Sequence, residues 1–365
     1  MVRCLLGCVC LVLFCASPVW ALNSWTLVKG DPKTSRVSVY HSFQEGVLLV
    51  AIENQGPFTC QPNRYLIFNA KTNQIRQIKA SQLLFGPDFK SLVYLSVTQV
   101  GPAPAARLPR WEQEIRALSE RTQASPALLE DTATIGGKTR CWQQPVLEDL
   151  EGNPKQKLEF LAANLCAEGW CNELQFEDAD HLRLWAKLER GMVDLVRLNL
   201  TSGQVERIKQ SKPFPYKAKN LEHAPRANLA ASEKPNQQVN LAPGIRLILE
   251  QSKKAWVVKL LGPDQAPALA GQRLQEAQQA QGQGEFDLAL LKAGLAHWLN
   301  AKDFDIRYFH LIALTQAGGT PFLDLEKDFA GAERKKACGR IHLDDAFKEA
   351  KQNKTFSVQF AKACP

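Results

Sequence analysis

Two stretches of the sequence, 130 residues apart, share the pattern of a tight β-hairpin. Positions 68–78 read FNAKTNQIRQI and positions 198–208 read LNLTSGQVERI, so that Asn, Gln and a final Ile recur in place. Asn73 and Gly203 occupy the same slot, and both residue types adopt a positive φ at little cost, as a tight turn requires. The match predicts that the N-terminal two-thirds of the chain is built from hairpins.

Hydrophobic patterning divides the rest of the chain. Residues 22–208 read as strands, either as one region or as two related subdomains at 22–100 and 133–208. Residues 209–244 are rich in Lys and Pro and predict an exposed linker, and residues 245–265 predict a further hairpin. Residues 270–365 are helical in pattern. We therefore expect an α+β protein: a β-rich N-terminal region (a meander, a propeller-like fold or a sandwich) followed by a C-terminal helical domain.

The first 21 residues have the pattern of a secretory signal peptide. Arg3 is followed by an apolar run over residues 5–16, and Val19-Trp20-Ala21 resembles a cleavage site. Cleavage near Ala21 would release a secreted or periplasmic protein. No later stretch reaches the length of a membrane span, so we expect no transmembrane segment in the mature chain.

Six cysteines follow the predicted signal peptide, and an even number in an oxidising compartment favours disulfide bonds. They are Cys60, Cys141, Cys166, Cys171, Cys338 and Cys364. Proximity in sequence favours one bond between Cys166 and Cys171 and another between Cys338 and Cys364, which leaves the first two cysteines to pair with each other. Their connectivity stays open. A zinc site would need a second close pair or paired histidines, so we expect no bound metal.

The helical region contains a pattern of small residues. After the sequence GEF at 284–286, Ala289, Ala293 and Ala296 recur at a spacing that lets two helices pack closely. Residues 271–318 resemble a degenerate tetratricopeptide repeat, although Glu276 and Ala280 stand where that family has large apolar residues. The resemblance implies a stack of helical hairpins with a protein- or peptide-binding surface and no catalysis. The strand pattern at 196–203 similarly resembles the blades of a β-propeller.

Sequence motifs for catalysis are missing. No Gly-x-Ser-x-Gly occurs, and the six histidines are scattered. His297 and His310 fall on neighbouring predicted helices and could approach each other, or could be ordinary surface or partly packed imidazoles. Trp170, between two cysteines, and Trp298 are candidate binding residues, or else core aromatics. We expect no cofactor, and an enzyme is the less favoured interpretation.

Charge narrows the choice of partner only slightly. The formal net charge is +8, from 45 basic and 37 acidic residues, and such a mild excess mostly favours solubility. Export and the lack of aromatic-basic clusters argue against nucleic acid. The leading hypothesis is an exported, disulfide-bonded module that binds another protein, to inhibit it or to assemble with it. The alternatives are an envelope hydrolase with dispersed carboxylates and a glycan-binding β module.

Overall fold

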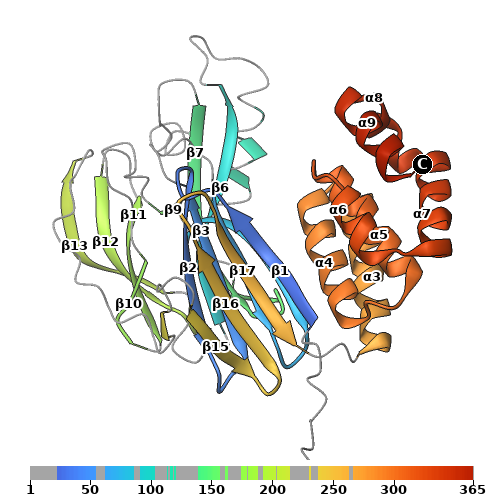
Figure 1. Ribbon diagram of the computed structural model, residues 1–365. Helices are drawn as coiled ribbons and strands as arrows, with labels where there is room; N and C mark the ends of the chain where they lie inside the picture. The colour runs from blue at the N-terminus through green and yellow to red at the C-terminus, as the bar shows by residue number, and fades with distance from the viewer. Residues whose placement is uncertain are drawn as a thin grey trace, which may run out of the picture.

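The fold is α+β, with a β-rich region followed by a helical domain at residues 267–363, as expected (Figure 1). The computed structural model describes residues 23–54, 62–85, 91–102, 113, 116–117, 119–120, 139–156, 161–162, 174–178, 180–187, 192–202, 204–213, 230–231, 237–262 and 266–364. The predicted signal peptide lies outside these residues.

A small antiparallel sheet joins the two ends of the β-rich region. Its strands, in spatial order, are β1 (Asn23–Gly30), β17 (Trp256–Gly262), β16 (Ile245–Gln251) and β15 (Gln237–Ala242). The first described strand therefore pairs with the last one before the helices. Strand β15, and part of β13 at residues 209–213, fall within the region expected to be a linker, so that region contains regular structure at both ends.

The other described strands form a large sheet of neighbouring antiparallel pairs. Its path is β13 (Val205–Pro213), β12 (Met192–Asn199), β11 (His181–Lys187), β9 (Leu161–Ala162), β7 (Thr139–Asp149), β6 (Ser91–Pro102), β5 (Gln74–Phe85), β4 (Asn63–Asn69), β3 (Val47–Asn54), β2 (Ser35–Ser42) and β14 (Ala230–Ala231). Off this path, β10 (Gln175–Phe176) pairs with β11, and β8 (Pro154–Gln156) pairs with β7. The propeller resemblance is not realised in these residues, because the strands continue from pair to pair without breaking into blades.

The two similar stretches of sequence, at 68–78 and 198–208, belong to the hairpins β4–β5 and β12–β13, which have the same turn chemistry. In β4–β5, Oδ1 of Asn69 accepts hydrogen bonds from the backbone N–H groups two and three residues later, at 3.0 and 3.3 Å. In β12–β13, Oδ1 of Asn199 accepts the equivalent pair at 3.0 and 2.8 Å. Asn73 has the expected positive φ of 49°, whereas Gly203 lies outside the described residues. The shared Asn thus closes each turn by hydrogen-bonding its own backbone.

Strand β3 is the centre of the β-rich region because both of its faces are buried. Residues 47–52 are all buried, which explains their continuous run of apolar side chains. Leu48, Val50 and Ile52 belong to a core shared with the small sheet, whereas Val47, Leu49 and Ala51 belong to a second core on the opposite face. At this end the two sheets therefore pack together as a sandwich.

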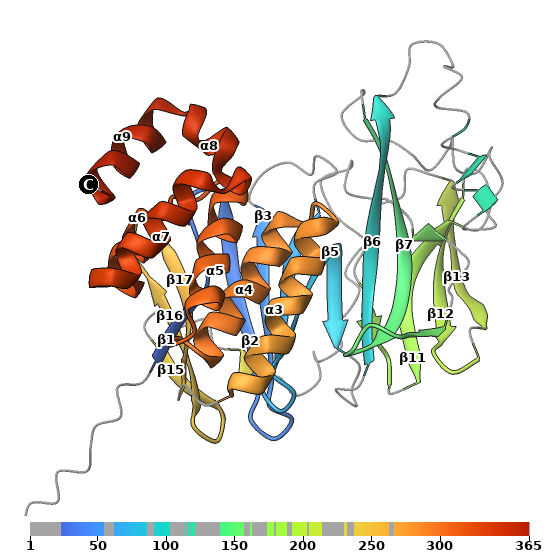
Figure 2. The same cartoon turned by 90° about the vertical axis from the view of Figure 1, so that its right-hand side faces the viewer.

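The helices after residue 266 cover one end of this assembly (Figure 2). They are α3 (Pro267–Gly282), α4 (Phe286–Leu299), α5 (Phe304–Gln316), α6 (Phe322–Asp328), α7 (Gly331–Leu343), the short 3₁₀ helix η2 (Asp345–Phe347), α8 (Lys348–Gln352) and α9 (Lys354–Ala363). Figure 2 shows α3–α5 in front of the strands at the β1–β5 end, while β6, β7 and β11–β13 extend beyond them. In the part of the chain that the structure describes, no helix is both long enough and apolar enough to cross a membrane.

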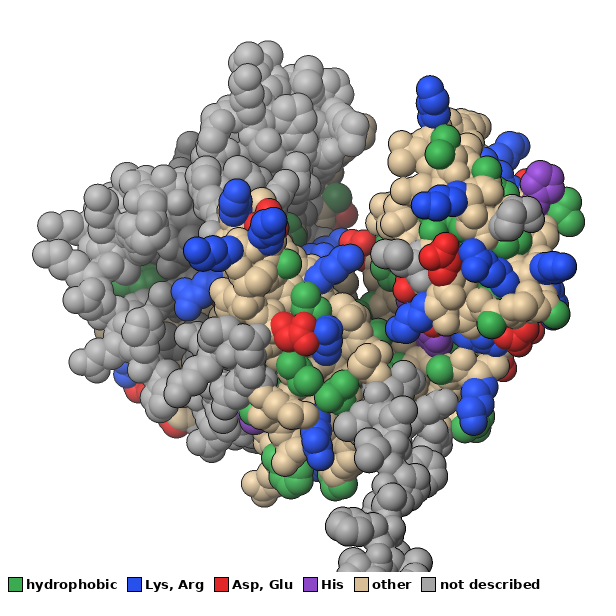
Figure 3. Space-filling model, in the orientation of Figure 1, with side chains coloured by type: hydrophobic (Ala, Val, Ile, Leu, Met, Phe, Trp, Pro, Cys, Tyr) green, Lys and Arg blue, Asp and Glu red, His purple; other side chains and the backbone are tan. Residues whose placement is uncertain are grey.

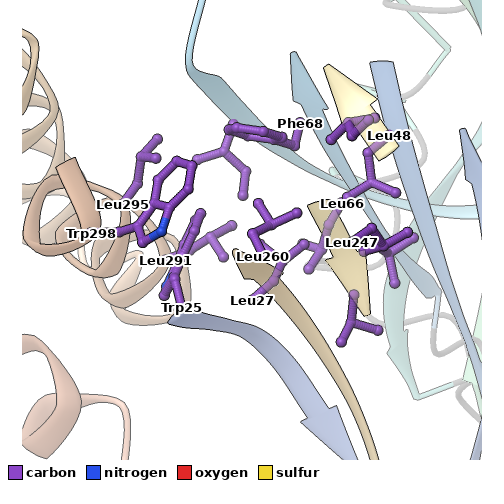
Figure 4. Close-up of a cluster of buried hydrophobic side chains, with 14 of the residues drawn as sticks. Trp25, Leu27, Leu48, Leu66, Phe68, Leu247, Leu260, Leu291, Leu295 and Trp298 are labelled. Carbon is purple, nitrogen blue, oxygen red and sulfur yellow. The ribbon is translucent and has the colours of Figure 1, made fainter. Parts of the chain in front are cut away.

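Three aromatic rings join α4 to both sheets (Figure 4). The Trp25 ring of β1 lies 5.9 Å from that of Trp298 on α4, and Phe68 of β4 lies 6.4 and 6.3 Å from these two rings, edge-on to both. All three side chains are buried. Edge-to-face packing of this kind adds to the stability that burial provides.

Two glycines leave room for these rings. A Cβ atom at Gly294 of α4 would lie 2.6 Å from Nε1 of Trp25, and one at Gly262 of β17 would lie 2.5 Å from the ring of Trp298. Both distances are shorter than atoms can approach without a clash. The close packing of α4 on the sheets therefore depends on glycine at both positions.

The last helices build a small core of their own against α5. Its buried residues are Tyr308, Leu311, Ile312, Phe322, Leu325, Phe329, Ala337, Ile341, Phe347, Phe356 and Ala363. The hydroxyl of Tyr308 donates a hydrogen bond to Asp344 at 3.1 Å, and Arg334 donates to the backbone oxygen of Ala363 at 2.7 Å. We call residues 322–364 the helical tail.

Candidate functional site

A pocket of about 560 Å³ lies where the helical cover ends over the large sheet. Gln77 and Lys79 of β5 form one wall, residues 284–288 at the start of α4 form another, and Gln316 with Ala317 at the end of α5 completes the lining. Gly284, with a φ of +76°, makes the turn between α3 and α4 and so brings the start of α4 to this position. We call this the β5–α4 pocket.

The β5–α4 pocket combines an exposed aromatic ring with polar groups. Phe286, one of the residues that line the pocket, is 39% exposed. Gln77 is half-buried in the opposite wall, and its buried Oε1 has no hydrogen-bond partner. A buried acceptor without a donor lowers the stability of the fold, so a donor that reached this oxygen would form a favourable hydrogen bond.

A second pocket of about 350 Å³ lies beside the first. It is bounded by Thr315 and Gln316 at the end of α5, by residues 318–320 after that helix, and by residues of the helical tail between Ala346 and Gln359. Gln316 lines both pockets, so both lie at the C-terminal end of α5. We call the second hollow the tail pocket.

Among the described residues that line these pockets, acidic side chains outnumber basic ones. Glu285 and Asp287 face Lys79 across the β5–α4 pocket, and Glu349 lines the tail pocket. In the view of Figure 3, by contrast, Lys and Arg side chains are scattered over the described part of the surface among Asp and Glu. The pockets therefore differ in local charge from a chain whose formal net charge is +8.

The two histidines singled out in the sequence do come together. His297 of α4 and His310 of α5 have ring centroids 5.3 Å apart. Asp328, at the end of α6, joins them with Oδ2 3.6 Å from Nε2 of His297. Burial, and then the charge of His297, lower the pKa of His310 to about 4, whereas burial raises the pKa of Asp328.

Trp298 lies in the interior and is not an exposed binding residue. It is 4% exposed and packs between α4 and the sheets, which makes it a core aromatic. Trp170, Cys60, Cys166 and Cys171 lie outside the described residues. Cys141 lies on β7, but its side chain is also outside them.

One predicted disulfide bond is present in the helical tail. Cys338 of α7 is bonded to Cys364, just after α9, with the Cα atoms 5.6 Å apart. The bond fixes the end of the chain against α7. It therefore holds together helices of only 5 to 13 residues, which bury little on their own.

Sequence reasoning missed Asp328, Phe286 as an exposed residue, and Gln77. Asp328 lies within four residues of another aspartate, Asp324, and a pair at that spacing shares one helix face, which was a usable signal. In the sequence, Phe286 belongs to the repeat-like pattern, which does not indicate that its ring is exposed. Gln77 follows a hairpin turn, and only the fold shows that a helix start lies opposite it.

The sequence matches no protein-family model, and a search of curated proteins found no match. We therefore infer the function from the geometry of the pockets and of the histidine cluster.

Proposed function

We propose that this protein is an exported, disulfide-bonded module that binds a segment of another protein at the β5–α4 pocket. The observation that carries the proposal is Phe286, an exposed aromatic ring at the edge of a pocket of about 560 Å³. Aromatic side chains are enriched at protein interfaces, where they bury much area at little entropic cost. The signal-peptide pattern supports the exported location.

The pocket chemistry favours an extended segment that carries an apolar side chain and basic residues. An apolar side chain would cover the ring of Phe286. A backbone N–H of such a segment would donate to Oε1 of Gln77, after a rotation of that amide toward the pocket. Lys or Arg residues would face the carboxylates of Glu285, Asp287 and Glu349. A segment that crosses the end of α5 would contact both pockets.

A pull-down with matched phenylalanine variants tests this proposal. The tagged protein would be incubated with an extract of the native envelope, and bound proteins would be identified by mass spectrometry. Phe286→Ala is expected to reduce capture of the partner by at least about 10-fold, since loss of a central aromatic contact typically costs 2 kcal/mol or more. Higher salt should also reduce capture, because the acidic groups are exposed.

Phe43→Ala is the matched control. Phe43 is 57% exposed, but it lies in the turn between β2 and β3 and does not line either pocket. This variant should capture the partner as the unmodified protein does. The proposal is wrong if no stoichiometric partner is captured at low salt, or if Phe286→Ala and Phe43→Ala capture equally well.

A further inference from the structure

Three side chains of types that can bind a metal ion converge in the helical domain from three different helices. His297 comes from α4, His310 from α5 and Asp328 from α6. One potential ligand atom from each of these residues lies within 4.8 Å of the other two. None of these three residues is among the described residues that line either pocket, so the cluster is a separate feature from the proposed binding surface.

One polar atom of this cluster has no partner of its own. Nδ1 of His310 is buried and has no hydrogen-bond partner. The 3.6 Å between Nε2 of His297 and Oδ2 of Asp328 is longer than a hydrogen bond. Buried polar atoms in folded proteins are nearly always paired, so the unpaired nitrogen of the His310 ring indicates a missing partner for that ring.

The charges around the cluster permit a cation. Asp324 lies one helical turn before Asp328 on the same face of α6, and its charge acts on both His310 and Asp328. Two cationic side chains also lie nearby, Lys327 and Arg307. The guanidinium of Arg307 is held by the carboxylate of Glu333 at 3.0 Å, which offsets its charge.

The geometry points to a divalent transition-metal site, suited to Zn²⁺, formed by His297, His310 and Asp328. Imidazole nitrogens and a carboxylate are ligands that Zn²⁺ uses in proteins, with bonds of about 2.0–2.2 Å. Ligand atoms in a tetrahedral site are then roughly 3.4 Å apart, so side-chain rotations would close the present spacing. The fourth position would be taken by water or by Asp324. Such a site would link α4 and α5 to the helical tail.

Metal titration of the full chain tests this inference. The purified protein, freed of metal with a chelator, would be titrated with Zn²⁺ by calorimetry and with Co²⁺ by visible absorption. We expect one ion per chain and the absorption of tetrahedral Co²⁺. His310→Gln and Asp328→Asn should each weaken binding by at least about 100-fold, because even outer-shell partners of a metal contribute 10–100-fold.

His342→Gln is the matched control, since His342 is an exposed histidine on α7 and should leave binding unchanged. Circular dichroism would establish that each variant is folded, and His297→Gln would replace any variant that is not. Zn²⁺ should also raise the melting temperature of the unmodified protein, because a ligand of the folded state stabilises it. The inference is overturned if the unmodified protein binds no stoichiometric ion, or if binding survives the loss of each of the three side chains.

Discussion

The helices of this protein are held in place in two different ways. Helix α4 packs on both sheets through large aromatic rings and shares their core, whereas the helical tail has a separate core of aromatic side chains and a disulfide bond. The first arrangement ties α4 to the stability of the whole β-rich region. The second lets the tail form from short helices and loosen without exposing the sheets. We therefore expect a substitution near α4 and a similar substitution in the helical tail to change stability differently.

Trp25, Phe68 and Trp298 form the contact between α4 and the two sheets, which we call the α4 junction. Removal of the Trp298 ring should have the largest effect on stability. Trp298→Ala leaves a cavity among Trp25, Phe68 and Trp298's other neighbours, and we expect it to lower the free energy of unfolding by about 3–5 kcal/mol. Urea unfolding of the whole chain measures this loss. Phe43→Ala, at an exposed phenylalanine, should change it by less than about 0.5 kcal/mol. Similar losses in the two variants would show that the junction is not a shared core.

Loss of the disulfide bond should have a large but local effect. The bond joins cysteines 26 residues apart, and the entropy of closing such a loop is worth about 3 kcal/mol. In the double variant Cys338→Ser, Cys364→Ser, hydrogen exchange should accelerate in the helical tail and stay unchanged in β3 and β4. Equal acceleration in those strands would mean that the tail and the sheets unfold as one unit.

Gly294→Ala should destabilise the α4 junction although alanine favours helices. The new Cβ would meet the Trp25 ring, and overpacking of this kind costs about 1–3 kcal/mol. Thermal unfolding should show a lower melting temperature than that of the unmodified protein. An unchanged or raised melting temperature would show that β1 shifts to accommodate the new Cβ atom at little cost in stability.

Gly339→Ala, in α7 of the helical tail, should have the opposite sign. No atom lies within 4 Å of a Cβ placed there, and the position is exposed, so only helix propensity changes. We expect a gain of about 0.5–1 kcal/mol, measured by thermal unfolding of the tail. A loss of stability in this variant would indicate that α7 contacts a part of the chain outside the described residues.

The predictable part of this structure is local in the sequence. The hairpin turns closed by Asn69 and Asn199 could be predicted because a short Asn-containing turn encodes its own geometry. The Cys338–Cys364 bond could be predicted because the two cysteines are close in sequence, and the approach of His297 to His310 followed from neighbouring helices.

The remainder depends on contacts between distant segments. Strand β1 pairs with β17 across more than 220 residues (Lys29 with Val257, for example), and no local pattern indicates that partner. The burial of Trp298 follows from this same pairing, because β1 carries Trp25 to α4. The β5–α4 pocket likewise exists only because a helix start is placed over a strand 200 residues earlier in the chain. Long-range pairings of this kind are set by the packing of the whole core and cannot be derived from periodicity.

Photo-crosslinking from the β5–α4 pocket would show directly whether this pocket binds a segment of another protein. A photoreactive phenylalanine analogue would replace Phe286 in one sample and Phe43 in another, and both would be irradiated in the native envelope. We expect one partner to be crosslinked to position 286, through a basic segment of that partner. The same partner should not be crosslinked to position 43. No crosslink from position 286, or the same products from both positions, would contradict the proposed binding.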